Sequence, residues 1–71
     1  MATDVLAHIT GTVWKIEVKQ GDAVEEGQVC VILESMKREM PVEAPEGGTV
    51  SAIHCAEGQA VNEGDKLLTL G

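Results

Sequence analysis

The 71-residue chain is near the size at which one hydrophobic core is barely sufficient, so we expect a single domain. Hydrophobic residues make up 44% of it, but with one Trp and no Phe or Tyr the core must come from aliphatic side chains. The net charge is −7 and only Lys37 and Arg38 place two cations together, which argues against a nucleic-acid-binding protein, whose ligand needs a positive surface.

The N-terminal segment "MATDVLAHIT" lacks the basic start and long apolar stretch of an export signal. No apolar run approaches the ~20 residues of a membrane span, so we expect no membrane association. The two cysteines, Cys30 and Cys55, form no closely spaced motif, which favours reduced thiols and a cytoplasmic location. A start at Met1 favours a free small protein over a piece of a longer chain.

The chain contains an internal repeat. A shift of 37 positions aligns residues 5–33 with residues 42–70, and twelve of the 29 aligned pairs are identical. Two copies predict two half-structures related by a pseudo-two-fold axis, because a solenoid needs three or more repeats. The identical pairs include Gly11/Gly48, Thr12/Thr49, Val13/Val50, Ile16/Ile53, Gly21/Gly58, Val24/Val61, Glu26/Glu63 and Gly27/Gly64.

Within each copy, β-branched stretches are separated by glycine-containing turns. "TVWKIEV" and "TVSAIHC" predict half-buried strands, and "QVCVILE" and "KLLTL" predict strands that close each copy. Val13 and Ile16 have opposite parity, which predicts a β-bulge or a bend between them and leaves open whether Trp14 faces the core or solvent. Gly27 and Gly64 are expected to adopt positive φ. Without any helical periodicity, the pattern predicts an all-β sandwich or flattened barrel.

The segment 34–41 joins the two copies and predicts a hairpin. Its symmetry counterpart is the pair of chain ends, so residues 36–37 should lie at the opposite end of the molecule from the termini. A non-glycine pair favours a type I turn, and proline at Pro41 and Pro45 favours strand starts or an edge. Lys37 would then present a primary amine from a rigid tip, as an acylation acceptor requires. An ordinary solvated turn lysine is the alternative.

Three motifs then carry a family resemblance. "ESMKREM" (34–40), "APEGGTV" (44–50) and "VKQGDAVEEGQ" (18–28) together resemble the biotinyl/lipoyl carrier family over nearly the whole chain. In particular they resemble its single-domain attachment proteins. The biotinyl branch characteristically reads Glu-Ala-Met-Lys-Met at its attachment hairpin. This chain matches it at Glu34, Met36 and Lys37.

The resemblance implies one biotinyl/lipoyl-carrier-like domain over residues 1–71. Its fold would be a flattened barrel-sandwich of two antiparallel four-stranded sheets with pseudo-two-fold symmetry. Lys37 would be amide-linked to biotin, with Glu34, Ser35, Met36 and Arg38 around it. Ser35 replaces the usual Ala, a small change, whereas Arg38 replaces the usual Met and weakens the match to biotin.

The resemblance leaves lipoate as an alternative cofactor. Lipoyl domains typically have an acidic residue where Met36 stands, which favours biotin. However, the compact segment 18–28 has no room for the extra loop of the acetyl-CoA carboxylase carrier and looks equally like a lipoyl domain. A lipoyl or dual biotin/lipoyl acceptor for a 2-oxoacid dehydrogenase-type complex therefore stays open, as does an unmodified interaction module of the same fold.

The resemblance also implies the partners: a biotin protein ligase, biotin carboxylase and carboxyltransferase components, and, in the alternative, a lipoate ligase. Biotin would accept a carboxyl group at one site and deliver it at another. The chain would be a monomer without catalysis of its own. We expect no metal site, because His8, His54 and the two cysteines fit no closed zinc pattern. Cys30 aligns with Leu67 and Cys55 with Val18, which predicts that both are core residues.

Overall fold

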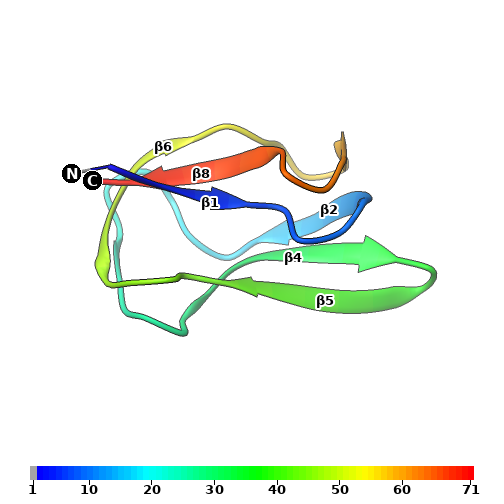
Figure 1. Cartoon of the computed structure of the whole chain (residues 1–71), viewed down its shortest axis with the longest axis horizontal. Coiled ribbons are helices and arrows are strands. Elements are labelled where there is room, and N and C mark those ends of the chain that lie inside the picture. The colour runs from blue at the N-terminus through cyan, green and yellow to red at the C-terminus, as the bar shows by residue number, and fades with distance from the viewer. Residues whose placement is uncertain (1) are drawn as a thin grey trace.

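The computed structural model describes residues 2–71 and contains eight β-strands (Figure 1). They form two antiparallel four-stranded sheets with the orders β1-β8-β6-β3 (the first sheet) and β5-β4-β2-β7 (the second sheet). The predicted all-β flattened sandwich is therefore confirmed, while Met1 of the predicted domain lies outside the described residues. The strands are β1 (Thr3–Leu6), β2 (Gly11–Ile16), β3 (Ala23–Val24), β4 (Val29–Ser35), β5 (Arg38–Glu43), β6 (Gly48–Ile53), β7 (Ala60–Val61) and β8 (Lys66–Leu70).

The two copies of the repeat are interlocked. The 37-residue shift carries β2 onto β6 and β3 onto β7, and each sheet contains strands from both copies. The backbone N–H of Gly21 donates to the carbonyl of Val50 at 2.7 Å, and at the symmetry-related position Gly58 donates to Val13 at 2.7 Å. Each glycine turn is thus fastened to a strand of the other copy, so neither half completes its hydrogen bonding alone.

The core between the sheets is aliphatic, as the composition requires. The structure describes no buried polar or charged side chain in residues 2–71, and it describes no helix long and apolar enough to cross a membrane. Small branched side chains from both sheets fill the narrow space between them, supplemented by the two cysteines. The fully buried larger side chains are Leu33, Leu67, Leu68, Val13, Val31, Val50 and Cys30.

The predicted bulge in β2 is present. The pairing of β2 with β4 shifts register between Val13 and Lys15, and β6 shifts at the equivalent place, between Val50 and Ala52. The extra residue in β2 is Trp14, whose side chain is 49% exposed while Val13 is fully buried. The bulge therefore answers the open question about the indole: it lies on the outer face of the second sheet.

Gly27 and Gly64 have φ values of +85° and +91°, confirming the predicted positive φ. A Cβ at Gly64 would meet no atom within 4 Å, so any cost of a side chain there comes from backbone strain alone. We expect Gly64→Ala to lower the free energy of unfolding by about 1 kcal/mol, measured by chemical denaturation.

Gly47 is the matched control because its φ is not in the left-handed region and its Cβ would make an ordinary contact of 3.5 Å with the carbonyl oxygen of Val24. Gly47→Ala should change the free energy of unfolding by less than about 0.5 kcal/mol, or raise it slightly. Equal losses in the two variants would show that the left-handed backbone is not what Gly64 provides.

Candidate functional site: the β4–β5 hairpin tip

The β4–β5 hairpin forms one end of the molecule (Figure 1). Its last cross-strand pair is Ser35 with Arg38, so Met36 and Lys37 alone make the turn. The two chain ends lie together at the other end of a body whose longest dimension is 33 Å, where Thr3 pairs with Leu70. The predicted hairpin and its position opposite the termini are both confirmed.

The turn itself differs from the prediction. Met36 has φ +53° and Lys37 has φ +63°, so both residues are left-handed and the turn belongs to type I′ instead of type I. The physical reason is strand twist: a two-residue loop between right-twisted antiparallel strands is accommodated by type I′, whereas type I would splay them. The identity of the two side chains favours type I, but the length of the loop determines the turn type. Holding two non-glycine residues there costs on the order of 1 kcal/mol each.

The tip presents three exposed side chains in a row: Met36, Lys37 and Arg38. Met36 is 92% exposed and packs against almost nothing. Within the described chain, the ion pairs join Lys15 to Glu17 and Lys66 to Asp4. Neither involves Lys37, whose amine meets solvent and has room for an acyl group.

The other two predicted site residues lie on β4, below the tip. Ser35 is half-buried, and Glu34 is exposed on the outer face of the second sheet, where it pairs across the strands with Glu39. The structure therefore places Met36 and Lys37 in the turn, Ser35 and Arg38 as the first pair below it, and Glu34 one residue further along β4.

Gly11 braces the stem of the hairpin, a role that the sequence did not reveal. It begins β2 beside β4, and a Cβ placed on it would lie 2.5 Å from the carbonyl oxygen of Glu34 and 3.4 Å from the Cβ of Ser35. Only a residue without a side chain allows β2 to approach the hairpin this closely. The repeat does mark this position in the sequence, because glycine occurs in both copies, at Gly11 and Gly48.

Comparisons with known proteins agree with this geometry. The family model of biotin/lipoyl domains, described as "Biotin-requiring enzyme", matches residues 2–70. The chain belongs to the biotin/lipoyl family.

Individual relatives within this family show how much of a protein the domain represents. The chain is 48% identical over 66 residues to a biotin/lipoyl attachment protein of Bacillus subtilis, covering 93% of this chain and 90% of that protein. It is 48% identical over 69 residues to a biotin carboxyl carrier protein of Streptococcus mutans, covering 97% of this chain but 53% of the relative. The structure of Kluyveromyces lactis urea carboxylase contains a region with TM-score 0.94 and 35% identity, which covers all of this chain and 6% of that enzyme.

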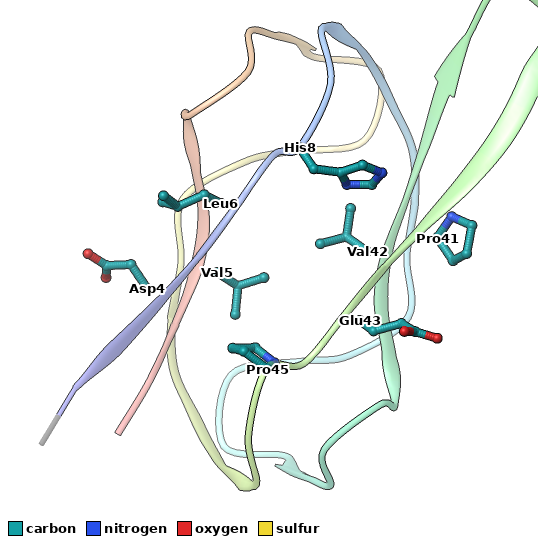
Figure 2. A pocket seen from close by; sticks show the side chains of 8 residues that line it. All are labelled: Asp4, Val5, Leu6, His8, Pro41, Val42, Glu43 and Pro45. Carbon is teal, nitrogen blue, oxygen red and sulfur yellow. The ribbon is translucent and has the colours of Figure 1, made fainter.

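Apart from the tip, this biotin/lipoyl-family domain has a hollow of about 340 Å³ between the edge strands β1 and β5 (Figure 2). Of its two carboxylates, that of Asp4 is engaged within the first sheet: Thr69 donates a hydrogen bond to it at 2.9 Å and Lys66 lies at 3.5 Å, and together they hold the pKa of Asp4 below its usual value. Residues 2–71 contain no group of three or more His, Cys, Asp or Glu side chains able to hold a metal. The hollow is lined by Asp4, Val5, Leu6, His8, Pro41, Val42, Glu43 and Pro45.

The two cysteines are free and buried, as predicted for core residues. Burial raises the pKa of both thiols, which disfavours the thiolate needed for nucleophilic or metal-binding chemistry. His54 is engaged elsewhere, with its Nε2 atom 2.7 Å from the hydroxyl of Thr69. The two thiols and His54 are therefore poor candidates for a reactive site.

The close approach at Gly11 yields a prediction. Gly11→Ala should lower the free energy of unfolding by about 2 kcal/mol. The new methyl group would collide with the backbone carbonyl of Glu34, which is held in the sheet. Gly48→Ala is the symmetry-matched control, since its Cβ would lie 3.4 Å from the Cβ of Leu70.

Chemical denaturation of both variants measures the difference, and we expect Gly48→Ala to lose less than half as much as Gly11→Ala. A Gly11→Ala protein as stable as Gly48→Ala would show that β2 does not brace the hairpin through this contact.

Proposed function

We propose that this domain carries biotin in an amide bond to the Nζ atom of Lys37 and presents it to the active sites of a biotin-dependent carboxylase. One observation carries the proposal: an exposed amine without an ion pair in the described chain, on a braced two-residue turn. The match of residues 2–70 to the biotin/lipoyl family supports it, as do the relatives named for biotin carboxyl carriage and urea carboxylase.

The division of labour follows from the geometry. When attached, biotin supplies the carboxyl-carrying chemistry, and the protein supplies position. The lysine stem and the biotin side chain together form an arm on the order of 10–15 Å, at ordinary bond lengths. A flexible arm on a rigid tip raises the effective concentration of the cofactor at each site within reach. The domain itself would catalyse nothing.

The partners follow from the same proposal. A biotin protein ligase would acylate Lys37, and biotin carboxylase and carboxyltransferase components would then use the cofactor. We propose that the domain visits them as a monomer in the cytoplasm. A lipoyl role is less well supported, because one relative is named as a biotin carboxyl carrier and another as a carboxylase, whereas the Bacillus subtilis protein's name includes both cofactors.

Lys37→Arg tests the attachment site. The variant keeps a cation at an exposed position, so its free energy of unfolding should stay within about 0.5 kcal/mol of the wild type. With biotin and a biotin protein ligase, the wild-type chain should gain the mass of one biotinyl group, and Lys37→Arg should gain none, as measured by intact-mass spectrometry.

The other lysines of the chain, at 15, 19 and 66, serve as internal controls. Biotin on Lys37→Arg would place the attachment elsewhere. An unmodified wild-type chain would remove the biotin proposal, and modification by a lipoate ligase alone would replace it with the lipoyl one.

A further inference from the structure

The outer faces of the two sheets are related by the pseudo-two-fold axis, and one of the places where they differ in chemistry is a row across three strands. On the second sheet this row consists of Trp14, Ile32 and Pro41, which we call the apolar triplet. The 37-residue shift places three polar residues at the same positions on the first sheet. These counterparts are, in the same order, Ser51, Thr69 and Asp4.

Strand register confirms that each set forms a row. Pro41 of β5 pairs with Ile32 of β4, and Ile32 pairs with Lys15 of β2, next to the bulged Trp14. The indole is 49% exposed, Pro41 is exposed and Ile32 is half-buried. Ile32 and Pro41 therefore form a directly paired apolar step on the outer face, and Trp14 adjoins it on β2 beside the exposed Lys15.

The polar row of the first sheet is satisfied by its own hydrogen bonds. The hydroxyl of Thr69 donates to the carboxylate of Asp4 at 2.9 Å, and the hydroxyl of Ser51 donates to the backbone carbonyl of Thr69 at 3.1 Å. His54 and Lys66 complete the network, at 2.7 Å from Thr69 and 3.5 Å from Asp4. The polar side chains of this row are therefore hydrogen-bonded within the first sheet. The apolar triplet, in contrast, has no such network and presents apolar surface whose burial by a partner would be favourable.

We propose that the apolar triplet is the docking surface for the enzyme that acylates Lys37, an inference that rests on the proposed function. That enzyme meets the domain before any cofactor is attached, so it can recognise only the protein's own surface. A specific interface buries roughly 800 Å² on each partner, more than the three side chains of a turn supply. The enzymes that act later can also hold the cofactor.

The position of the triplet fits this role. Ile32 and Pro41 lie on β4 and β5, the two strands that carry the attachment turn. Ile32 precedes Lys37 by five residues, which is about 15 Å along a strand. A single interface of ordinary size therefore covers the triplet while the lysine enters an active site.

Charge defines the chemistry of the partner. Glu34 and Glu39 pair across the strands on the same outer face, between the triplet and the tip, and both are exposed. Like charges in directly opposed positions destabilise a sheet, and a basic partner relieves this repulsion. The enzyme should present an apolar slot for the indole, flanked by Lys or Arg facing these carboxylates. Added salt should therefore lower the rate of acylation.

The test is the steady-state rate of biotinylation of the purified chain by a biotin protein ligase. Trp14→Ser, which installs the residue of the symmetry-related position, should lower kcat/KM about tenfold or more, mainly through KM. Leu6→Ser is the control, because Leu6 is 45% exposed on an edge strand of the first sheet and should stay within about twofold of the wild type. Pro41→Ser is a second triplet variant, with an expected loss of about threefold.

Circular dichroism and denaturation should show Trp14→Ser and Leu6→Ser folded. Unchanged biotinylation of both triplet variants would overturn the docking proposal alone, as would an equal loss in Leu6→Ser. Normal biotinylation of Trp14→Ser followed by impaired carboxylation of its biotin would also overturn it, assigning the surface to the carboxylase. A wild-type chain that accepts no biotin would instead overturn the proposed function and this proposal with it.

Discussion

The exchange of backbone hydrogen bonds between the two copies of the repeat is the constraint on which the rest of the structure depends. Gly21 bonds to Val50 and Gly58 bonds to Val13, so each turn is held by the other half. A core made only of aliphatic side chains and two cysteines is small, and interlocking lets both sheets share it. The shared core in turn gives the β4–β5 hairpin a rigid base, which a tethered reactive group needs in order to be presented in a defined direction.

The hairpin tip combines rigidity with backbone strain. Two-residue type I′ turns usually contain Asn or Gly, yet here Met36 and Lys37 both adopt positive φ. Such strain persists only where the surroundings overdetermine the conformation, and the close approach of Gly11 to Glu34 is part of that surrounding structure. The turn thus holds Met36 and Lys37 in a backbone conformation where glycine or asparagine would be more stable.

Much of this arrangement could be predicted from the sequence, because the repeat links distant segments before any fold is known. The bulge beside Val13 and the left-handed Gly64 both follow from local pattern and are confirmed. The predicted turn type is wrong because the twist of the strands outweighs the preference of the two side chains. The contact of Gly11 with β4 and the outward direction of Trp14 depend on how strands pair, which local pattern alone does not determine.

Duplication also gives this domain an internal reference for separating structural from functional residues. Positions where the fold imposes a requirement should be alike in both copies, and Gly21/Gly58 and Val13/Val50 are alike. Where the two copies differ, the fold does not require a particular residue. The polar row on the first sheet shows that the fold accepts hydrogen-bonding side chains there, so the exposed indole on the second sheet is not needed for folding. Ile32 and Pro41 of the apolar row lie on the strands that carry Lys37, and Trp14 lies on the neighbouring β2, which fits recognition of the hairpin by a partner.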